Sequence, residues 1–385
     1  MSNININNKR IGIVGGGQLG KMMILEAKRL GFYIVVLDAA ADCPCSSICD
    51  EVIVAPLDEE AGYFELAGKV DVITYEWENI NAATLEALER DGHIIYPSVK
   101  SLKTIQSKFT QNTVLHKNNI PIPRFEKITN AEEIKELSKK FGYPMMLKAT
   151  RFGYDGKGNA LIKTEADTEA AFNRLGSGRV ELMVEEFMDF ELEVSVIATR
   201  GTDGKNAIYP VVENIHTNSI LDVSIVPARI DESTAQKAIS TAFKVMEVFE
   251  GVGTFGIELF VGKDGGIYVN EIAPRVHNSG HYTIEGCFCN QFENHIRAIT
   301  GLPLGNTDLL QPTVMVNLLG ESNGKARLLG VEEAYRDPKV KVHFYGKSES
   351  KIGRKVGHYT VVGDDLSQTI KRAEELKKII KVVGE

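Results

Sequence analysis

The sequence lacks any apolar run of the roughly 18–20 residues that a membrane-spanning helix requires. Its first ten residues are polar and rich in Asn, and they contain no apolar segment typical of a secretory signal. We therefore expect a cytoplasmic protein that does not bind membranes.

Cysteine is scarce, with five residues in a chain of 385, which is too few for a disulfide framework. Cys43, Cys45 and Cys49 are close together, and Cys287 and Cys289 form a C-x-C pair. Neither group contains the C-x-x-C pairs that are typical of zinc sites. Of the two interpretations, metal ligands or reduced structural thiols, the spacing favours structural thiols.

Positive charge is not in excess, because 44 Lys and Arg residues face 52 Asp and Glu residues, for a net charge of −8. We found no long basic run, and we therefore expect no nucleic-acid partner. At roughly 100–200 residues per domain, the length indicates two or three domains. The 43% of apolar residues is enough to give each domain a core and excludes a disordered chain.

The first part of the chain, residues 1–110, alternates short apolar runs with helical patterns. This alternation predicts a doubly wound parallel α/β domain. The expected strands are residues 10–14, 33–37, 51–55, 70–75 and 94–96, and the first expected helix is 18–30.

Two further units are expected, a small α+β unit over residues 111–190 and a larger α+β unit over 191–385 that ends in a small β-rich part. The boundary is expected near residues 110 to 120, where a predicted helix at 101–118 ends and Pro121 and Pro123 then interrupt regular structure. The expected strands are 145–149, 159–162 and 180–185, and the expected helices are 167–175, 233–249 and 367–383.

A glycine motif follows the first predicted strand and opens the first predicted helix. Gly15, Gly17 and Gly20 fit G-x-G-x-x-G, and Asp38 lies at a suitable distance to bind a ribose. Taken alone, the motif favours a dinucleotide fold. It shows only that the backbone approaches an anion at a helix N-terminus, and a tight strand-to-helix turn is the alternative.

A second glycine-rich loop, Gly153 to Asn159, is not a Walker A motif because no Ser or Thr follows Lys157. It lies between two predicted strands, so its amides could cover phosphates as a mobile flap. Lys148 ends the preceding apolar strand, where a buried ammonium needs an anion. An ordinary hairpin is the alternative interpretation.

A predicted hairpin carries two carboxylates. Apolar runs at 254–261 and 267–272 flank Asp264-Gly265, which is a strong two-residue turn signal. Counting outward from that turn pairs Lys263 with Gly266, Val261 with Tyr268, and Glu258 with Glu271. Like charges placed directly opposite repel each other, and a Mg²⁺ ion between them removes the penalty. A Lys partner for one Glu, or a bulge that shifts the register, remains possible.

Polar residues that could hold a small oxyanion follow this hairpin. Arg275, His277, Asn278 and His281 lie within seven residues. Near the carboxyl end, Arg354 and Lys355 form a compact cationic pair between glycines, which by itself indicates no more than a surface turn.

Four motifs together resemble a single family. They are GGGQLG from Gly15, GYDGKGN from Gly153, NEIAPRVHNSGH from Asn270 and GRKVGH from Gly353. Over residues 11 to about 360 the chain is similar to the N5-carboxyaminoimidazole ribonucleotide synthetases, which are ATP-grasp enzymes of purine biosynthesis. The resemblance implies three domains, with ATP held between the central and carboxyl-terminal ones, and commonly a homodimer.

The resemblance also implies an ATP site and a Mg²⁺ site. The implied ATP-binding residues are Lys108, Lys148, Gly153, Tyr154, Asp155, Gly156, Lys157, Gly158, Asn159, Glu185, Glu186, Phe187, Met188, Glu193, His216, Asn270 and Glu271. The implied Mg²⁺ ligands are Glu258 and Glu271, in agreement with the hairpin count.

A third implied site binds the other two substrates. The residues expected to bind the ribonucleotide are Gln18, Leu19, Glu76, Arg354 and Lys355. Those expected to surround bicarbonate and take part in catalysis are Arg275, His277, Asn278, Lys355, Tyr154 and Asp155.

The reaction implied by the resemblance is that of an ATP-dependent ligase that forms a C–N bond. ATP, bicarbonate and 5-aminoimidazole ribonucleotide would give the N5-carboxylated ribonucleotide, ADP and phosphate, through carboxyphosphate. One alternative is another ATP-grasp ligase, such as a formate-dependent ribonucleotide transformylase. Another is a nicotinamide-dependent oxidoreductase built on Gly15 to Gly20, which leaves the pairing of Glu258 with Glu271 unexplained.

Overall fold

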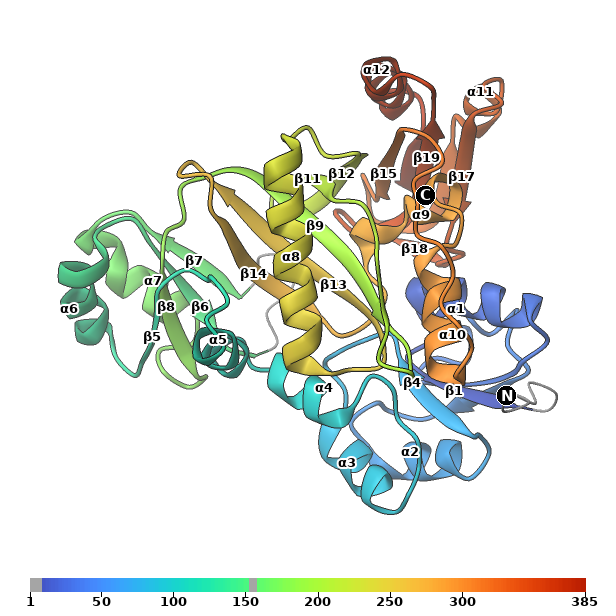
Figure 1. Ribbon diagram of the computed structural model, residues 1–385, viewed down its shortest axis with the longest axis horizontal. Coiled ribbons are helices and arrows are strands. Elements are labelled where there is room, and N and C mark those ends of the chain that lie inside the picture. The colour runs from blue at the N-terminus through green and yellow to red at the C-terminus, as the bar shows by residue number, and fades with distance from the viewer. Residues whose placement is uncertain (1–8, 152–157) are drawn as a thin grey trace.

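The computed structural model describes residues 9–151 and 158–385, and within them the strands form four sheets (Figure 1). A parallel sheet is formed by the amino-terminal part of the chain, and a small antiparallel sheet lies at the opposite side of the molecule. A nine-stranded antiparallel sheet, called the long sheet below, lies between them. Residues 153–157 of the second glycine loop lie outside the described residues. In the described part of the chain, no helix is both long and apolar enough to cross a membrane.

The amino-terminal sheet has the strand order β3-β2-β1-β4, with every pair parallel, which confirms the predicted doubly wound arrangement. Strands β1, β2 and β4 are almost entirely buried because helices cover both faces, whereas the edge strand β3 is partly exposed. The expected strand at 94–96 is reduced to one bridge between Ile73 and Ile95. The elements are β1 (Arg10–Val14), α1 (Gln18–Arg29), β2 (Tyr33–Asp38), β3 (Glu51–Val54), α2 (Glu60–Ala67), β4 (Val72–Tyr75) and α3 (Ala82–Arg90).

Two helices, α4 (Val99–Ile105) and α5 (Lys108–Lys117), replace the single helix expected at 101–118. The chain breaks at Ser107, whose backbone is extended and whose side chain accepts a hydrogen bond from the Thr110 amide. This N-cap starts a new helix instead of continuing the old one. The break also directs the Lys108 amide to the Thr150 carbonyl, at 2.8 Å.

The small sheet is antiparallel, with the order β5-β8-β6-β7, and the three expected strands in it are confirmed. Helices α6 and α7 bury Ile134 and Ala171 against Leu147 and Val184. The elements are β5 (Phe125–Ile128), α6 (Ala131–Phe141), β6 (Met145–Ala149), β7 (Asn159–Ile162), η1 (Glu165–Asp167), α7 (Thr168–Arg174) and β8 (Leu182–Glu186).

The long sheet runs β14-β13-β9-β11-β12-β15-β19-β17, with β10 paired to β9. Helix α8 packs on one face through Ala238, Ala242 and Val245. The strands are β9 (Phe190–Arg200), β10 (Asn206–Ile208), β11 (Val212–Thr217), β12 (Ile220–Val226), β13 (Gly253–Gly262), β14 (Ile267–Ala273), β15 (Thr313–Leu319), β17 (Val340–Phe344) and β19 (Lys355–Val362). The helices are α8 (Glu232–Phe249), η2 (Asn278–Gly280), α9 (Thr283–Gly286) and α10 (Gln291–Thr300).

Helix α10 joins the amino-terminal sheet and the long sheet into one body. It lies alongside α1 (Figure 1), and its apolar residues Phe292, Ile296 and Ile299 share a core with Leu19 and Met23 of α1. The segment between β14 and α10 is therefore held against the start of α1. This packing brings the first glycine turn to the same side of the molecule as the predicted carboxylate hairpin.

The carboxyl-terminal end contains a further small sheet, β18-β16-β20. The helix expected at 367–383 is too long, because α12 ends at Lys377 and the chain returns as a strand. Ile380, just before that strand, and Val382, within it, are both buried in the adjacent core. The elements are β16 (Gly324–Leu329), α11 (Val331–Ala334), β18 (Glu349–Ser350), α12 (Leu366–Lys377) and β20 (Lys381–Gly384).

Candidate active site

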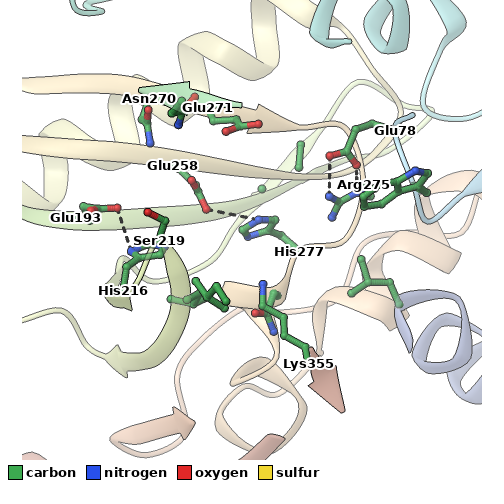
Figure 2. A pocket seen from close by; sticks show the side chains of 18 of the residues that line it. Glu78, Glu193, His216, Ser219, Glu258, Asn270, Glu271, Arg275, His277 and Lys355 are labelled. Carbon is green, nitrogen blue, oxygen red and sulfur yellow. Dashed lines mark hydrogen bonds and ion pairs between the residues drawn. The ribbon is translucent and has the colours of Figure 1, made fainter. Parts of the chain in front are cut away.

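A cavity of about 870 Å³ lies where the amino-terminal sheet, the small sheet, the long sheet and the segment 347–355 meet (Figure 2). It brings together most of the residues proposed from the sequence. Those that line it are Gln18, Leu19, Glu76, Lys148, Asn159, Glu185, Glu186, Phe187, Met188, Glu193, His216, Glu258, Asn270, Glu271, Arg275, His277, Asn278, Arg354 and Lys355. Lys108 reaches the site through Glu271, and Gly158 lies at the edge of the described residues.

The carboxylate hairpin has the expected partners but a different register. Gly262 pairs with Gly266 around a three-residue turn, so Val261 lies opposite Ile267 and not opposite Tyr268. The predicted two-residue turn was therefore wrong. A bulge at Asn270 adds one residue to β14, and Glu258 lies opposite Glu271 after all.

These two carboxylates differ in their electrostatic surroundings. Burial, together with the charge of Glu271, raises the pKa of Glu258 to about 7. Burial also raises the pKa of Glu271, but Lys108, with its Nζ 2.7 Å from Glu271 Oε2, outweighs burial and lowers it overall. Glu271 is therefore neutralised by a lysine, whereas the charge of Glu258 is unfavourable without a cation.

The pair fits a Mg²⁺ ion that takes the rest of its ligands from a bound phosphate. Mg²⁺ commonly uses one or two carboxylates plus phosphate oxygens and water. Within residues 9–151 and 158–385, no group of three or more His, Cys, Asp or Glu side chains could hold a metal by itself. Glu258 and Glu271 therefore offer an incomplete set of hard oxygen donors, which suits a metal that arrives with a nucleotide.

On the side of the small sheet, a buried ion pair faces the cavity. Lys148 on β6 contacts Glu185 on β8, and both side chains are less than a tenth exposed. The Asn112 side-chain amide also donates to Glu185, at 2.9 Å. Glu186 instead pairs with Arg124 at the surface, so its carboxylate is engaged away from Lys148.

A histidine and a glutamate lie together on neighbouring strands of the long sheet. His216 Nδ1 is 3.0 Å from Glu193 Oε2 (Figure 2). Burial lowers the pKa of His216, but the Glu193 carboxylate outweighs burial and raises it above the ordinary value. The two residues form a polar edge of the cavity.

The first glycine turn is occupied by carboxylates of the protein itself. Glu76, after β4, accepts hydrogen bonds from the Gly17 and Gly20 amides. Asp38 accepts from the Gly16 amide at 2.7 Å and from the Ala40 amide at 2.8 Å, so both of its carboxylate oxygens are engaged by the backbone. The amides that would hold a dinucleotide pyrophosphate are therefore already satisfied, and the dinucleotide interpretation of this motif was wrong.

Arg275 is held by a residue that the sequence reasoning missed. Its guanidinium makes a two-pronged ion pair with Glu78, including a bond of 3.0 Å from Nη2 to Oε1 (Figure 2). The Arg275 side chain is 10% exposed and that of Glu78 is 22% exposed. Glu78 follows Glu76 by two residues at the end of a parallel strand, and that position is a signal that could have identified it.

The two polar residues that follow Arg275 are also fixed. Burial, with the charges of Arg275 and Lys355, holds the pKa of His277 well below its ordinary value. Asn278 and Asn317 exchange two amide hydrogen bonds, of 3.0 and 2.7 Å. Asn317 lies on β15, about forty residues away, and the sequence carried no signal for it.

A cationic segment closes the other side of the cavity. Lys347, which the sequence reasoning also missed, lines the cavity with Lys351, Arg354 and Lys355. Burial, together with the nearby charge of Arg354, lowers the pKa of Lys347 to about 8. Four cations within nine residues were the available signal, and they make this end of the cavity suited to a phosphate.

All five cysteines are free thiols, in agreement with the predicted structural role. Burial raises the pKa of Cys287 and of Cys289 to about 12. Burial also raises the pKa of Cys45, so these thiols are neutral and unreactive at physiological pH.

Three family models match successive parts of the chain. They are the ribonucleotide synthetase preATP-grasp domain over residues 8–106, the ATP-grasp domain over 113–292, and the phosphoribosylaminoimidazole carboxylase C-terminal domain over 313–372. The predicted ATP-grasp fold is confirmed by these matches.

Known proteins match nearly the whole chain. An N5-carboxyaminoimidazole ribonucleotide synthase of Bacillus subtilis (strain 168) is 41% identical over 355 residues, which are 91% of this chain and 90% of that protein. The crystal structure of the synthetase from Thermotoga maritima is 46% identical, has a TM-score of 0.90 and covers 98% of this chain and all of its own. The synthase of Aspergillus clavatus in complex with ADP and 5-aminoimidazole ribonucleotide is 33% identical, with a TM-score of 0.90 and 97% and 98% of the two chains covered.

Proposed function

The chain belongs to the N5-carboxyaminoimidazole ribonucleotide synthases, and from this premise we propose which of its residues carry out the reaction. It is an ATP-dependent ligase of purine biosynthesis that carboxylates 5-aminoimidazole ribonucleotide to the N5-carboxy product. The observation that carries the residue assignments is the direct pairing of Glu258 with Glu271. The pair lies in one cavity with Arg275 and with the cationic segment 347–355.

We propose that ATP lies between the small sheet and the β13–β14 hairpin. The ion-paired lysines support this position, because Lys108 pairs with Glu271 and Lys148 is close enough to lower the pKa of the same carboxyl. The residues assigned to ATP are those expected from the sequence, from Lys108 to Glu271, and they include Gly153 to Lys157, which lie outside the described residues. Mg²⁺ held by Glu258 and Glu271 would neutralise the β- and γ-phosphate oxygens.

In the proposed reaction, an oxygen of bicarbonate attacks the γ-phosphorus of ATP, the bond to ADP breaks, and carboxyphosphate forms. Phosphoryl transfer depends mainly on alignment and charge neutralisation, and Lys108, Lys148 and Arg275 would supply both. The exocyclic amine of the ribonucleotide then forms the C–N bond to the carboxyl carbon, the C–O bond to phosphate breaks, and the departing phosphate takes up the proton that the amine loses. Carboxyphosphate hydrolyses readily, so the loop around Tyr154 and Asp155 is assigned to excluding water.

The ribonucleotide is proposed to bind between the first glycine turn and the cationic segment. Gln18 and Leu19 line the cavity at the start of α1, and Lys347, Arg354 and Lys355 line the same cavity. Because Glu76 satisfies two amides of the turn, it is assigned to shaping this subsite and to the ribose side of the substrate, while the cations bind its phosphate.

The finer organisation is also part of the proposal. We assign the chain to three units, at 1–110, 111–190 and 191–385, and expect a homodimer. A cytoplasmic location is proposed because ATP, bicarbonate and the ribonucleotide are charged metabolites that the reaction must draw from one pool.

The decisive experiment measures ADP release by the purified protein with Mg·ATP and bicarbonate, with and without fresh 5-aminoimidazole ribonucleotide. We expect strong stimulation by the ribonucleotide, which is lost when bicarbonate is removed. Stimulation by formate and a different ribonucleotide instead would support a transformylase. ADP release at the same rate with and without either ribonucleotide would overturn the assignment of this cavity to the ribonucleotide.

A further inference from the structure

His277 occupies a tightly defined position between β13 and α10. A Cβ at Gly256 would overlap the Cβ and ring of His277, so the imidazole lies directly against a strand that has no side chain there. The Gln291 side chain holds the His277 backbone from the other side. It accepts from the His277 amide at 2.9 Å and donates to the His277 carbonyl at 2.7 Å.

The inner ring nitrogen, Nδ1, is an acceptor of hydrogen bonds. His277 is the N-cap of η2, and its Nδ1 accepts from the Ser279 backbone amide at 3.3 Å. A backbone amide can only donate, so this nitrogen carries no proton. The Ser279 hydroxyl is 2.9 Å from the same nitrogen.

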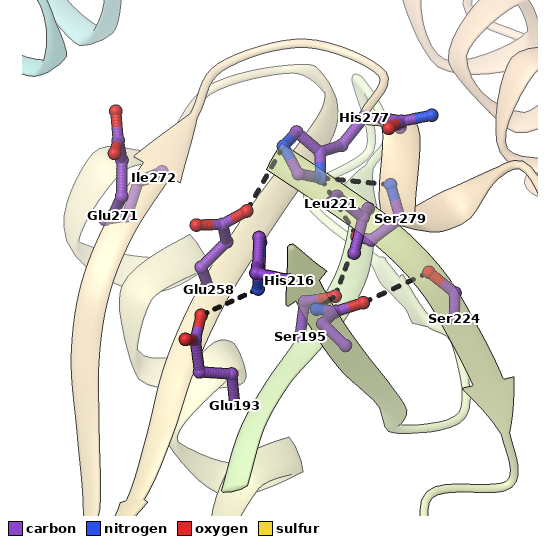
Figure 3. A network of polar contacts seen from close by, with 12 residues as sticks. Glu193, Ser195, His216, Leu221, Ser224, Glu258, Glu271, Ile272, His277 and Ser279 are labelled. Carbon is purple, nitrogen blue, oxygen red and sulfur yellow. Dashed lines mark hydrogen bonds and ion pairs between the residues drawn. The ribbon is translucent and has the colours of Figure 1, made fainter. Parts of the chain in front are cut away.

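A chain of buried side chains directs that hydroxyl toward the ring (Figure 3). The Ser224 hydroxyl donates to Asn214 Oδ1, the Asn214 amide donates to Ser195 Oγ at 2.9 Å, and Ser195 donates to Ser279 Oγ at 2.7 Å. Because Ser279 Oγ receives a hydrogen bond from Ser195, its own proton is directed to His277 Nδ1. All of these side chains except that of His277 are nearly inaccessible to solvent.

The outer ring nitrogen, Nε2, faces the cavity. Its contact with Glu258 Oε1 is 3.6 Å, too long for a hydrogen bond (Figure 3). His277 and Glu258 both line the cavity beside Arg275. With Nδ1 fixed as an acceptor, the single ring proton lies on Nε2 and points into the reaction space.

We propose that Ser279 and Ser195 are positioning residues that hold His277 as its Nε2-protonated tautomer, so that His277 donates a hydrogen bond to the bicarbonate-derived group and accepts no proton. Ser279 acts on Nδ1 through both its amide and its hydroxyl, and Ser195 acts through Ser279. The tautomer follows from the contacts alone, whereas the role as a donor rests on the proposed function of the cavity.

The tautomer is tested on the protein without ligands. In a long-range ¹H–¹⁵N spectrum of protein labelled at histidine, His277 is identified as the signal pair that disappears in His277→Gln. We expect Nδ1 at the unprotonated position and Nε2 at the protonated position. Protonated Nδ1, or a ring averaged between tautomers, would overturn the proposal.

Ser279→Ala gives a second spectroscopic readout that a merely structural role would not move. Loss of one donor should shift the His277 Nδ1 resonance and lower kcat about 3- to 10-fold with an unchanged KM for ATP. The control is Thr199→Val, which removes the buried hydrogen bond between the hydroxyls of Thr199 on β9 and Thr254 on β13. Ser195 also lies on β9, but this bond does not contact His277. Thr199→Val should change neither the His277 signals nor kcat; an equal effect of both variants would contradict the positioning role.

The donor role is tested by comparing substitutions of His277 itself. Gln places an amide N–H near the position of Nε2, whereas Asn places it near Nδ1 and Ala offers none. We expect His277→Gln to keep carboxylation within about 10-fold of the wild type, and Ala and Asn to lose about 100-fold. If Gln is as poor as Ala, the ring transfers a proton and the proposal fails. If all three variants are fully active while the tautomer is as stated, the assignment of His277 to the reaction fails instead.

Discussion

Glu258 on β13 and Glu271 on β14 are direct cross-strand partners, and an extra residue at Asn270 makes them so. The three-residue turn sets one register for the outer part of the hairpin, and the bulge changes it by one residue before the carboxylates are reached. Two negative charges therefore lie side by side, with the Glu258 side chain 23% exposed and that of Glu271 42% exposed, and Lys108 forms its ion pair with Glu271. The same substitution at the two positions should consequently have opposite effects on stability.

Glu258→Gln should stabilise the metal-free protein at alkaline pH. Burial and the charge of Glu271 raise the pKa of Glu258 from 4.5 to about 7. The folded protein then binds more protons than the unfolded chain, so stability is lost as the pH rises from 4.5 through 7. Because the side chain is 23% exposed, we expect a gain of about 2 kcal/mol at pH 8 and little change at pH 4.5. Urea denaturation in the presence of a chelator measures it; a loss of stability at pH 8 would contradict it.

Glu271→Gln should destabilise the protein, because it leaves the Lys108 ammonium without its carboxylate. The Lys108 side chain is 14% exposed but that of Glu271 is 42% exposed, so solvent screens the pair and we expect a cost of about 1 kcal/mol in urea denaturation. Both variants should lose more than about 100-fold of Mg²⁺-dependent ADP formation. Near-normal turnover of either variant would refute the assignment of that residue to the metal.

Glu78→Gln should impair the use of bicarbonate. The substitution keeps the shape of the side chain but removes the charge that holds Arg275. We expect kcat/KM for bicarbonate to fall about 10- to 100-fold, with the KM for ATP unchanged. The control is Glu86→Gln, which removes an exposed pair with Lys103 and should leave the kinetics unaltered. A rise in the KM for ATP alone would indicate a different role.

Lys347 should make binding of the ribonucleotide sensitive to pH. Burial and the charge of Arg354 lower its pKa to about 8, so the ammonium is present below pH 8 and is lost above it. We expect the KM for the ribonucleotide to rise as the pH increases beyond 8, and this rise to be absent in Lys347→Arg, whose guanidinium stays charged. Lys139→Met, at an exposed pair with Glu136 that does not line the cavity, is the control and should show the same pH dependence as the wild type.

His295 should contribute to acid sensitivity. It is buried between Thr74 and the Thr254 amide, and burial lowers its pKa from 6.5 to about 3. Below pH 6.5 the unfolded chain binds the extra proton, so stability falls as the pH falls from 6.5 toward 3. Between pH 8 and pH 5, His295→Gln should lose about 2 kcal/mol less than the wild type in urea denaturation. His116→Gln, on the exposed end of α5, should not change this difference.

Most elements and one pairing could be predicted from the sequence because their signals are local. The apolar runs that became β1, β6 and β7 are continuous, and the pattern of α8 repeats at helical spacing. The pairing of Glu258 with Glu271 was predicted correctly from a two-residue turn that proved wrong. The prediction held because the three-residue turn and the bulge shift the register by one residue each, and the two shifts cancel. The split at Ser107 was missed because its side chain caps a new helix, and the late strand β20 was missed because packing of Ile380 and Val382 overrides helical periodicity there.

By itself, the sequence determined which chemical groups the chain carries and the family whose motifs it resembles, because motifs and periodicity are properties of neighbouring residues. Only the tertiary structure decided which groups meet. Glu78 holds Arg275 from 197 residues away, and Ser195 directs Ser279 across 84 residues. Such contacts are made by sheets and helices that pack together, and no pattern along the chain records them, because two residues brought together by packing need share no spacing in sequence.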